Sequence, residues 1–296
     1  MMNLGKDAKV AILAPSAQIG DIGKIEKGLN YLKSIGLVPV LGENTLKQYR
    51  YMAGTDKQRA DDINSAFADS EIKAIFCVRA AAGALRILPY LDYELIKNNP
   101  KPIIGFCDNA ALQAAVYEKS GICSLNGFSL TYDFKSDELD EKIKKSFENI
   151  IFGKNEEIIS GKCRQSGHAE GELICSNLTT LLYLAGSGYF PSLSGKILLI
   201  EDVHERMHRL DMMLQQLKQQ PDFNKLNGII LGQFTDIQGD EEDGSLEDCI
   251  RDFLEGVNVP VIQNFEFGHT KSRYVLPFGA KVIMNADECK LSQKGF

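Results

Sequence analysis

The chain has 296 residues, of which 44% are hydrophobic and 25% are charged, and 40 acidic against 33 basic side chains give a formal net charge of −7. These fractions are typical of a globular protein and exclude intrinsic disorder, collagen-like repeats and a coiled coil. The acidic balance and the lack of a Lys/Arg-rich run argue against a nucleic-acid partner. The length predicts about two domains.

Segment hydrophobicity and cysteine spacing narrow the class of protein further. No run approaches the roughly 18 apolar residues of a transmembrane helix, and the N-terminus lacks the apolar core of a signal peptide. The seven cysteines form no C-x-x-C pair, so we expect neither a disulfide framework nor a thiolate zinc site. We therefore expect a protein of the reducing cytoplasm with no membrane partner.

The first half of the chain alternates short apolar runs with helical patterns. Strands are expected at residues 10–14, 37–40, 72–78 and 102–106, and helices at residues 25–35 and 56–68 and from residue 84. Asp56 is expected to cap the second of these helices. Strands separated by helices at this spacing predict βαβ units around a parallel sheet.

A highly charged stretch then separates this half from the next. It contains one amphipathic helix near residues 138–151, and we expect an N-terminal domain at 1–135, a linker region at 136–168 and a C-terminal domain at 169–296. In the last of these, strands are expected at 196–200, 227–233, 259–263 and 280–285, and helices at 209–219 and 246–255.

Cys107 lies where a buried strand runs through Gly105 directly into an Ala-rich helix. This is the layout of a nucleophile elbow, in which a sharp turn lifts one side chain to the top of the sheet. The start of the following helix would lower the pKa of a thiol there, and the backbone N–H of Asp108 is a natural oxyanion donor. A buried structural cysteine is the alternative interpretation.

Two further places in the second half carry reactive side chains. Glu201 and Asp202 end an apolar strand, where open α/β sheets place functional groups, although a helix cap or a solvated turn is the alternative. His269 follows a glycine in a loop, where a surface histidine is the alternative. His204 and His208 are four residues apart but lack the H-E-x-x-H pattern, so no zinc site is expected.

These places together supply a nucleophile, a base and an orienting acid, in the order Cys, Glu, His. Their surroundings resemble the LD-carboxypeptidase family, the serine peptidases that also include the microcin C immunity proteins. The motifs that carry the resemblance are spread over nearly the whole chain: APS at 14–16, AGTDKQRADDIN at 53–64, GFCD at 105–108, LIEDVHE at 199–205, FGH at 267–269 and LPFG at 276–279.

The resemblance implies two α/β domains: an N-terminal parallel-sheet domain with the nucleophile elbow and a smaller C-terminal α/β domain, with the active site at their interface. It implies a metal-independent, cofactor-free cytoplasmic hydrolase, commonly a homodimer. Its substrate would be the murein tetrapeptide, from which it releases the terminal D-Ala during cell-wall recycling. Cys107 would be the nucleophile, His269 the general base and Glu201 the acid that orients it.

The remaining candidate residues follow from the same resemblance. The oxyanion hole would use the N–H groups of Asp108 and of Ala80 and Ala81, and the expected substrate contacts are Arg79, Gly83, Asn177 and Arg273. For the two arginines a surface salt bridge is the alternative.

The chain also departs from the family pattern around this one site. Cys107 replaces serine, and the family's RGGYG loop reads RAAAG at 79–83, which would strain Ala80 or Ala81 if φ is positive there. The family's GGNL reads CSNL at 175–178, and its GP reads Gly127-Phe128. A pocket retuned for another peptidyl conjugate, or a protein that binds peptide without turnover, is therefore the alternative to the LD-carboxypeptidase.

Overall fold

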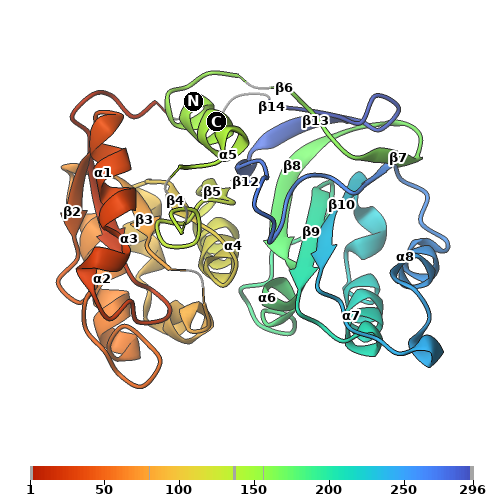
Figure 1. Cartoon of the computed structure of the whole chain (residues 1–296), viewed down its shortest axis with the longest axis horizontal. Coiled ribbons are helices and arrows are strands. Elements are labelled where there is room, and N and C mark those ends of the chain that lie inside the picture. Colours follow the sequence, from red (N-terminus) through yellow and green to blue (C-terminus); the bar gives the residue numbers. More distant parts are fainter. Residues whose placement is uncertain (1–2, 80, 136–137, 156, 294–296) are drawn as a thin grey trace.

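The computed structural model describes residues 3–79, 81–135, 138–155 and 157–293, and it contains two sheets, each flanked by helices (Figure 1). The two-domain α/β architecture expected from the sequence is confirmed. The first sheet has six strands in the order β12-β5-β4-β3-β1-β2. Its strands from the N-terminal half are β1 (Lys9–Leu13), β2 (Val38–Leu41), β3 (Ile72–Cys77), β4 (Ile103–Gly105) and β5 (Ser124–Asn126).

These five strands are parallel, and helices connect them as the spacing predicts. The helices of this half are α1 (Glu26–Ser34), α2 (Asp56–Ala68), α3 (Tyr93–Asn98), α4 (Asn109–Ser120) and α5 (Glu141–Ile151). Thr55, one residue before the expected cap, forms a capping box with Gln58 at the start of α2. The helix expected from residue 84 is a 3-10 helix, Ala84–Tyr90, which contains Pro89.

The second sheet has eight strands in the order β6-β14-β13-β8-β9-β10-β11-β7. Strands β8 to β11 are parallel and the outer strands are antiparallel, so this sheet is mixed and has more strands than the first. Its strands are β6 (Glu157–Ile159), β7 (Lys162–Gln165), β8 (His168–Asn177), β9 (Ile197–Val203), β10 (Gly228–Thr235), β11 (Val261–Gln263), β13 (Lys281–Asn285) and β14 (Lys290–Gln293). Its helices are α6 (Leu178–Leu182), α7 (Met207–Lys218) and α8 (Leu246–Leu254).

The segment expected to be a linker is divided between the two domains. The apolar face of α5 packs into the N-terminal core through Ile143, Phe147 and Ile150, because an amphipathic helix must bury that face. Strands β6 and β7 belong to the second sheet, where they pair with β14 and β11.

The two domains are joined by more than this connection. Strand β12 (Leu276–Phe278) comes from the C-terminal half but pairs antiparallel with β5 in the first sheet. One apolar cluster also runs from Leu112 on α4 to Cys175 on β8 and Leu178 on α6. The chain therefore passes three times between domains that share a core, from α5 to β6, from β11 to β12 and from β12 to β13.

In the described part of the chain, no helix is both long and apolar enough to cross a membrane. Among the same residues, no group of three or more His, Cys, Asp and Glu side chains is arranged to hold a metal ion.

Candidate active site

The turn between β4 and α4 has the geometry of a nucleophile elbow. Cys107 has a φ of 56°, a left-handed conformation that costs energy for any residue with a Cβ. Gly105 makes the tight turn possible, since a Cβ there would lie 2.8 Å from the Cβ of Asn109. The strand therefore presents the Cys107 thiol at the start of α4, as the sequence predicts.

The expected lowering of the Cys107 pKa is wrong. Burial raises the pKa of the thiol well above its ordinary range, and the carboxylates of Glu201 and Asp108 act in the same direction. The backbone N–H of Asp108 opposes this rise by hydrogen bonding to the sulfur. In this environment the resting group is a neutral thiol that needs a base.

The Asp108 side chain ties the elbow to the loop that precedes the 3-10 helix. Its Oδ2 accepts hydrogen bonds from Ser16 Oγ at 2.6 Å and from the backbone N–H of Ala84 at 2.7 Å. Burial raises the pKa of this carboxyl, although these bonds and one from the Gly83 N–H favour its ionised form. Asp108 thus fixes Gly83 and Ala84, at the end of this loop, beside the nucleophile.

Within that loop, the candidate residues have different surroundings. The strain expected at Ala80 or Ala81 stays a prediction, because Ala80 lies outside the described residues. Gly83 has a φ of 145°, and its carbonyl accepts a hydrogen bond of 2.8 Å from the buried Arg59. Arg79 is part-buried and donates to the backbone carbonyl of Gln18.

His269 and Glu201 form a close buried pair. The imidazole Nδ1 lies 2.8 Å from Glu201 Oε2, and the side chains are 11% and 0% exposed. Because a carboxylate only accepts, this contact assigns the imidazole proton to Nδ1 and leaves the Nε2 lone pair free to act as a base. The structure brings this acid and base together as the sequence predicts.

Glycine at position 268 gives Glu201 the room to reach His269. Gly268 has a φ of 135°, and a Cβ there would lie 3.0 Å from Glu201 Oε2 and 3.1 Å from the Gln233 carbonyl oxygen. The carboxylate also accepts a weaker bond from the His269 backbone N–H at 3.3 Å. The FGH motif is therefore a steric requirement of the acid–base pair.

Aromatic rings connect this pair to the elbow. The His269 ring lies 4.6 Å, centroid to centroid, from Phe106, the residue before Cys107, and 6.2 Å from Tyr132. Among the described residues, no hydrogen bond joins Cys107 to His269; such contacts often tighten only when a substrate binds.

Asn177 and Asp202 are engaged with each other. Asn177 Nδ2 donates to Asp202 Oδ1 at 2.9 Å, and its Oδ1 caps α6 by accepting the Thr180 N–H at 3.0 Å. Asp202 Oδ2 also accepts the N–H of Thr179 at 2.9 Å. Asp202 thus supports the cap that Asn177 forms on α6, and it does not cap α7, the helix that follows it in the chain.

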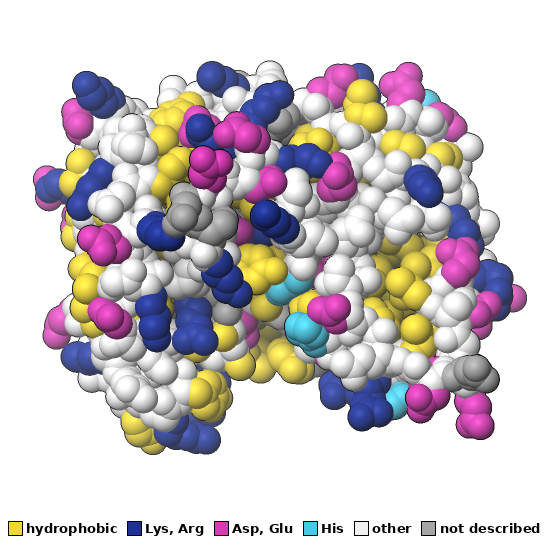
Figure 2. Space-filling model, in the orientation of Figure 1, with side chains coloured by type: hydrophobic (Ala, Val, Ile, Leu, Met, Phe, Trp, Pro, Cys, Tyr) yellow, Lys and Arg dark blue, Asp and Glu magenta, His cyan; other side chains and the backbone are white. Residues whose placement is uncertain are grey.

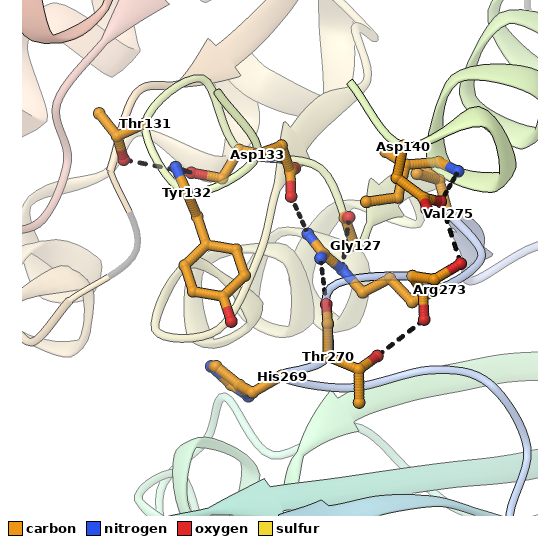
Figure 3. Close-up of polar contacts among 12 residues, drawn as sticks. Gly127, Thr131, Tyr132, Asp133, Asp140, His269, Thr270, Arg273 and Val275 are labelled. Atoms are coloured by element: carbon orange, nitrogen blue, oxygen red, sulfur yellow. Dashed lines mark hydrogen bonds and ion pairs between the residues drawn. The ribbon is translucent and has the colours of Figure 1, made fainter. Parts of the chain in front are cut away.

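Arg273 is fully buried, and its guanidinium is directed at protein acceptors (Figure 3). Its guanidinium donates to Asp133 Oδ1 at 2.6 Å and to the backbone carbonyls of Gly127 and Thr270, each at 3.0 Å. Neither the expected grip on a substrate carboxylate nor the alternative surface salt bridge describes this side chain. The sequence pattern gave no indication of its partner Asp133.

A cavity of about 690 Å³ opens beside the His269 loop, and Tyr132, Asp140 and Lys271 are among its lining residues. On the face shown in Figure 2, histidine side chains lie where the surface is hollowed between the two halves, with lysine and arginine side chains nearby. Tyr132 and Lys271 were not singled out from the sequence, since neither falls in a strand-end motif.

The comparisons with known proteins agree with this architecture. Residues 10–127 match the LD-carboxypeptidase N-terminal domain, and residues 170–284 match the LD-carboxypeptidase C-terminal domain. A murein tetrapeptide carboxypeptidase of Pseudomonas aeruginosa is 31% identical over 96% of this chain and 95% of its own length. The microcin C7 self-immunity protein MccF of Escherichia coli is 29% identical over 90% of this chain and 86% of its own.

The fold also has solved counterparts. The crystal structure of a muramoyltetrapeptide carboxypeptidase from Oxalobacter formigenes superposes with a TM-score of 0.88 and 25% identity, covering 96% of this chain and 97% of that one. The matched domains, in the same order and over most of the chain, place this protein: it belongs to the LD-carboxypeptidase family.

Proposed function

We propose that this protein is a peptidase that releases the terminal D-Ala from murein tetrapeptide, with Cys107 as its nucleophile. The observation that carries the proposal is the buried Glu201–His269 pair at 2.8 Å beside the left-handed turn at Cys107. The names of the relatives support a carboxypeptidase acting on murein peptides, and hence a role in peptidoglycan recycling. The same proposal places the protein in the cytoplasm and gives it a homodimeric assembly.

Acylation begins at the neutral thiol. His269 Nε2 takes the Cys107 proton as the sulfur attacks the scissile carbonyl carbon, and Glu201 stabilises the imidazolium through the Nδ1–H. The raised thiol pKa favours this concerted transfer over a thiolate that exists before substrate binds.

Oxyanion stabilisation falls to backbone N–H groups. The N–H of Asp108 already points at the sulfur of the elbow, and the loop at 80–81 would supply a second donor. The Asp108 carboxylate accepts the N–H of Ala84 and so holds the residue after Gly83 close to the elbow.

The tetrahedral intermediate then collapses. His269 gives its proton to the departing D-Ala amine, which leaves a thioester on Cys107. Water, deprotonated by His269, attacks the thioester and restores the free thiol. Lys271, which lines the cavity, and Arg79 are candidates to bind substrate carboxylates, and Gly83 and Asn177 are candidates to shape the site.

The proposal is tested by incubating the enzyme with purified murein tetrapeptide and measuring the released D-Ala. The parent should release D-Ala, and Cys107→Ala should lose at least about 10³-fold in rate. Cys163→Ala, which removes an exposed cysteine, is the matched control and should keep the parental rate. No release by the parent at high enzyme concentration would contradict the proposal.

A second candidate function is cleavage, or binding without turnover, of a different peptidyl conjugate. The RAAAG sequence at 79–83 and the similarity to the microcin C7 self-immunity protein favour it. The two functions are separated by a panel of peptidyl conjugates, with thermal stabilisation of the protein as the measure of binding. Binding of one conjugate, without release of D-Ala from murein tetrapeptide, would favour the second function.

A further inference from the structure

Arg273 connects the loop that carries the candidate base to the domain that carries the nucleophile. Two of its acceptors, Gly127 and Asp133, lie in the N-terminal domain just after β5. The third is the backbone carbonyl of Thr270, the residue after His269 (Figure 3). One side chain therefore joins both sides of the proposed site.

The same guanidinium also packs against the elbow itself. Its central carbon lies 4.3 Å from the centroid of the Phe106 ring, and that ring lies 4.6 Å from the His269 ring. Phe106 directly precedes Cys107. Its ring contacts with Arg273 and His269 therefore constrain the distance between the proposed base and the proposed nucleophile. Tyr132 adds a second ring, 5.3 Å from the guanidinium carbon.

We propose that Arg273 is a positioning residue that holds the His269 loop against the nucleophile elbow and so sets the approach of His269 to Cys107. This inference rests on the proposed function, because it concerns the acid–base step of the same site. Arg273 itself touches neither the substrate nor the reacting atoms.

The chemistry of the contacts requires arginine in particular. A planar guanidinium can donate to three acceptors in different directions while its face stacks on a ring, whereas lysine offers a point charge. A buried ion pair is by itself weak grounds for stability, since desolvation offsets much of the attraction between the charges. The Arg273 and Asp133 side chains are at most 1% exposed. We therefore attribute this ion pair to positioning of the His269 loop.

The test compares Arg273→Lys with the parent in two measurements. The first is kcat and KM for D-Ala release, where we expect kcat to fall by about 10- to 100-fold with KM unchanged, because a small displacement of the base slows only the chemistry. The second is the low-field NMR signal of the His269 Nδ1–H bound to Glu201, assigned with His269→Ala. We expect this signal to weaken or shift in Arg273→Lys.

Tyr117→Phe is the matched control. Tyr117 joins α4 to the second domain through Glu172 at 2.8 Å, but it does not contact the His269 loop. We expect the parental kcat and the parental NMR signal in this variant. A kcat and a signal in Arg273→Lys equal to those of the parent would overturn the inference, and so would an equal loss of kcat in Tyr117→Phe.

If Arg273→Lys does not fold, the pair can be replaced as a unit by Arg273→Met with Asp133→Asn, which keeps an acceptor for the Ser129 N–H. This folded variant should show the same fall in kcat and the same change in the NMR signal; parental values for both would overturn the inference. The NMR measurement needs no substrate, so it tests the positioning role even if the parent releases no D-Ala, an outcome that contradicts only the proposed function.

Discussion

At the scale of single residues, the unusual feature is a thiol where relatives of this family have a serine. A thiol is a better nucleophile than a hydroxyl and needs less help from a base. Here, however, burial and nearby carboxylates raise its pKa, so the proposed mechanism assigns His269 to remove the proton. The buried Glu201 carboxylate has two effects: it accepts a hydrogen bond that orients His269, and its charge disfavours a free thiolate at Cys107.

Glu201→Gln tests the orienting role at nearly constant size. The amide can still accept the Nδ1–H but no longer stabilises the imidazolium, and it can donate to the wrong tautomer instead. We expect kcat for D-Ala release to fall by about 10²- to 10⁴-fold. Far-UV circular dichroism checks that the variant folds, and a kcat within a few-fold of the parent would show that Glu201 has no part in the chemistry.

At the scale of elements, strand ends and loops place the site. The sequence located β4 and β9, because continuous apolar runs before Gly105 and Glu201 are strong strand signals, although β9 continues to Val203, three residues past its expected end. The course of the 268–273 loop was not predictable, since its shape depends on Arg273 and Asp133, which are 140 residues apart in the chain. Contacts between residues far apart in the chain also place Arg273 in the protein interior and α5 in the N-terminal core, and a sequence pattern does not show such contacts.

Gly268→Ala tests whether this loop leaves room for the acid–base pair. A positive φ alone costs an alanine about 1 kcal/mol, and here the new Cβ would also crowd Glu201 Oε2. We expect a loss of unfolding free energy of at least about 1 kcal/mol together with a loss of D-Ala release.

The control for this variant is Gly186→Ala. Gly186 has a φ of 77° and open space around its Cβ position, so it reports the backbone cost alone. Urea unfolding of both variants should show the larger loss for Gly268→Ala; equal losses, with activity retained at Gly268→Ala, would argue against the steric role.

At the scale of the whole molecule, two sheets share a core, and β12 from one half completes the sheet of the other. This arrangement fixes the relative position of Cys107, the proposed nucleophile on one domain, and His269, the proposed base on the other. Two cysteines in the strands of this core, Cys77 and Cys175, are fully buried, and burial raises the pKa of each thiol above its ordinary value of 9.0.

These buried thiols predict how stability depends on pH. Above about pH 9 the thiols of the unfolded chain ionise while those of the folded chain stay protonated, so the free energy of unfolding should fall as pH rises. Each thiol contributes up to about 1.4 kcal/mol per pH unit. Urea unfolding between pH 8 and 10 measures the slope of the unfolding free energy against pH. Cys175→Ala should reduce this slope, and Cys163→Ala should leave it unchanged. A slope unaffected by Cys175→Ala would refute the prediction.

The central claim is that Cys107 forms a covalent acyl-enzyme during release of D-Ala. The most direct measurement is intact mass spectrometry of the enzyme, quenched with acid during turnover of murein tetrapeptide, followed by mapping of the adduct. The account predicts a mass increase equal to the tetrapeptide less D-Ala, held as a thioester on Cys107 and absent from Cys107→Ala. An adduct on another residue, or D-Ala release by Cys107→Ala at the parental rate, would contradict it.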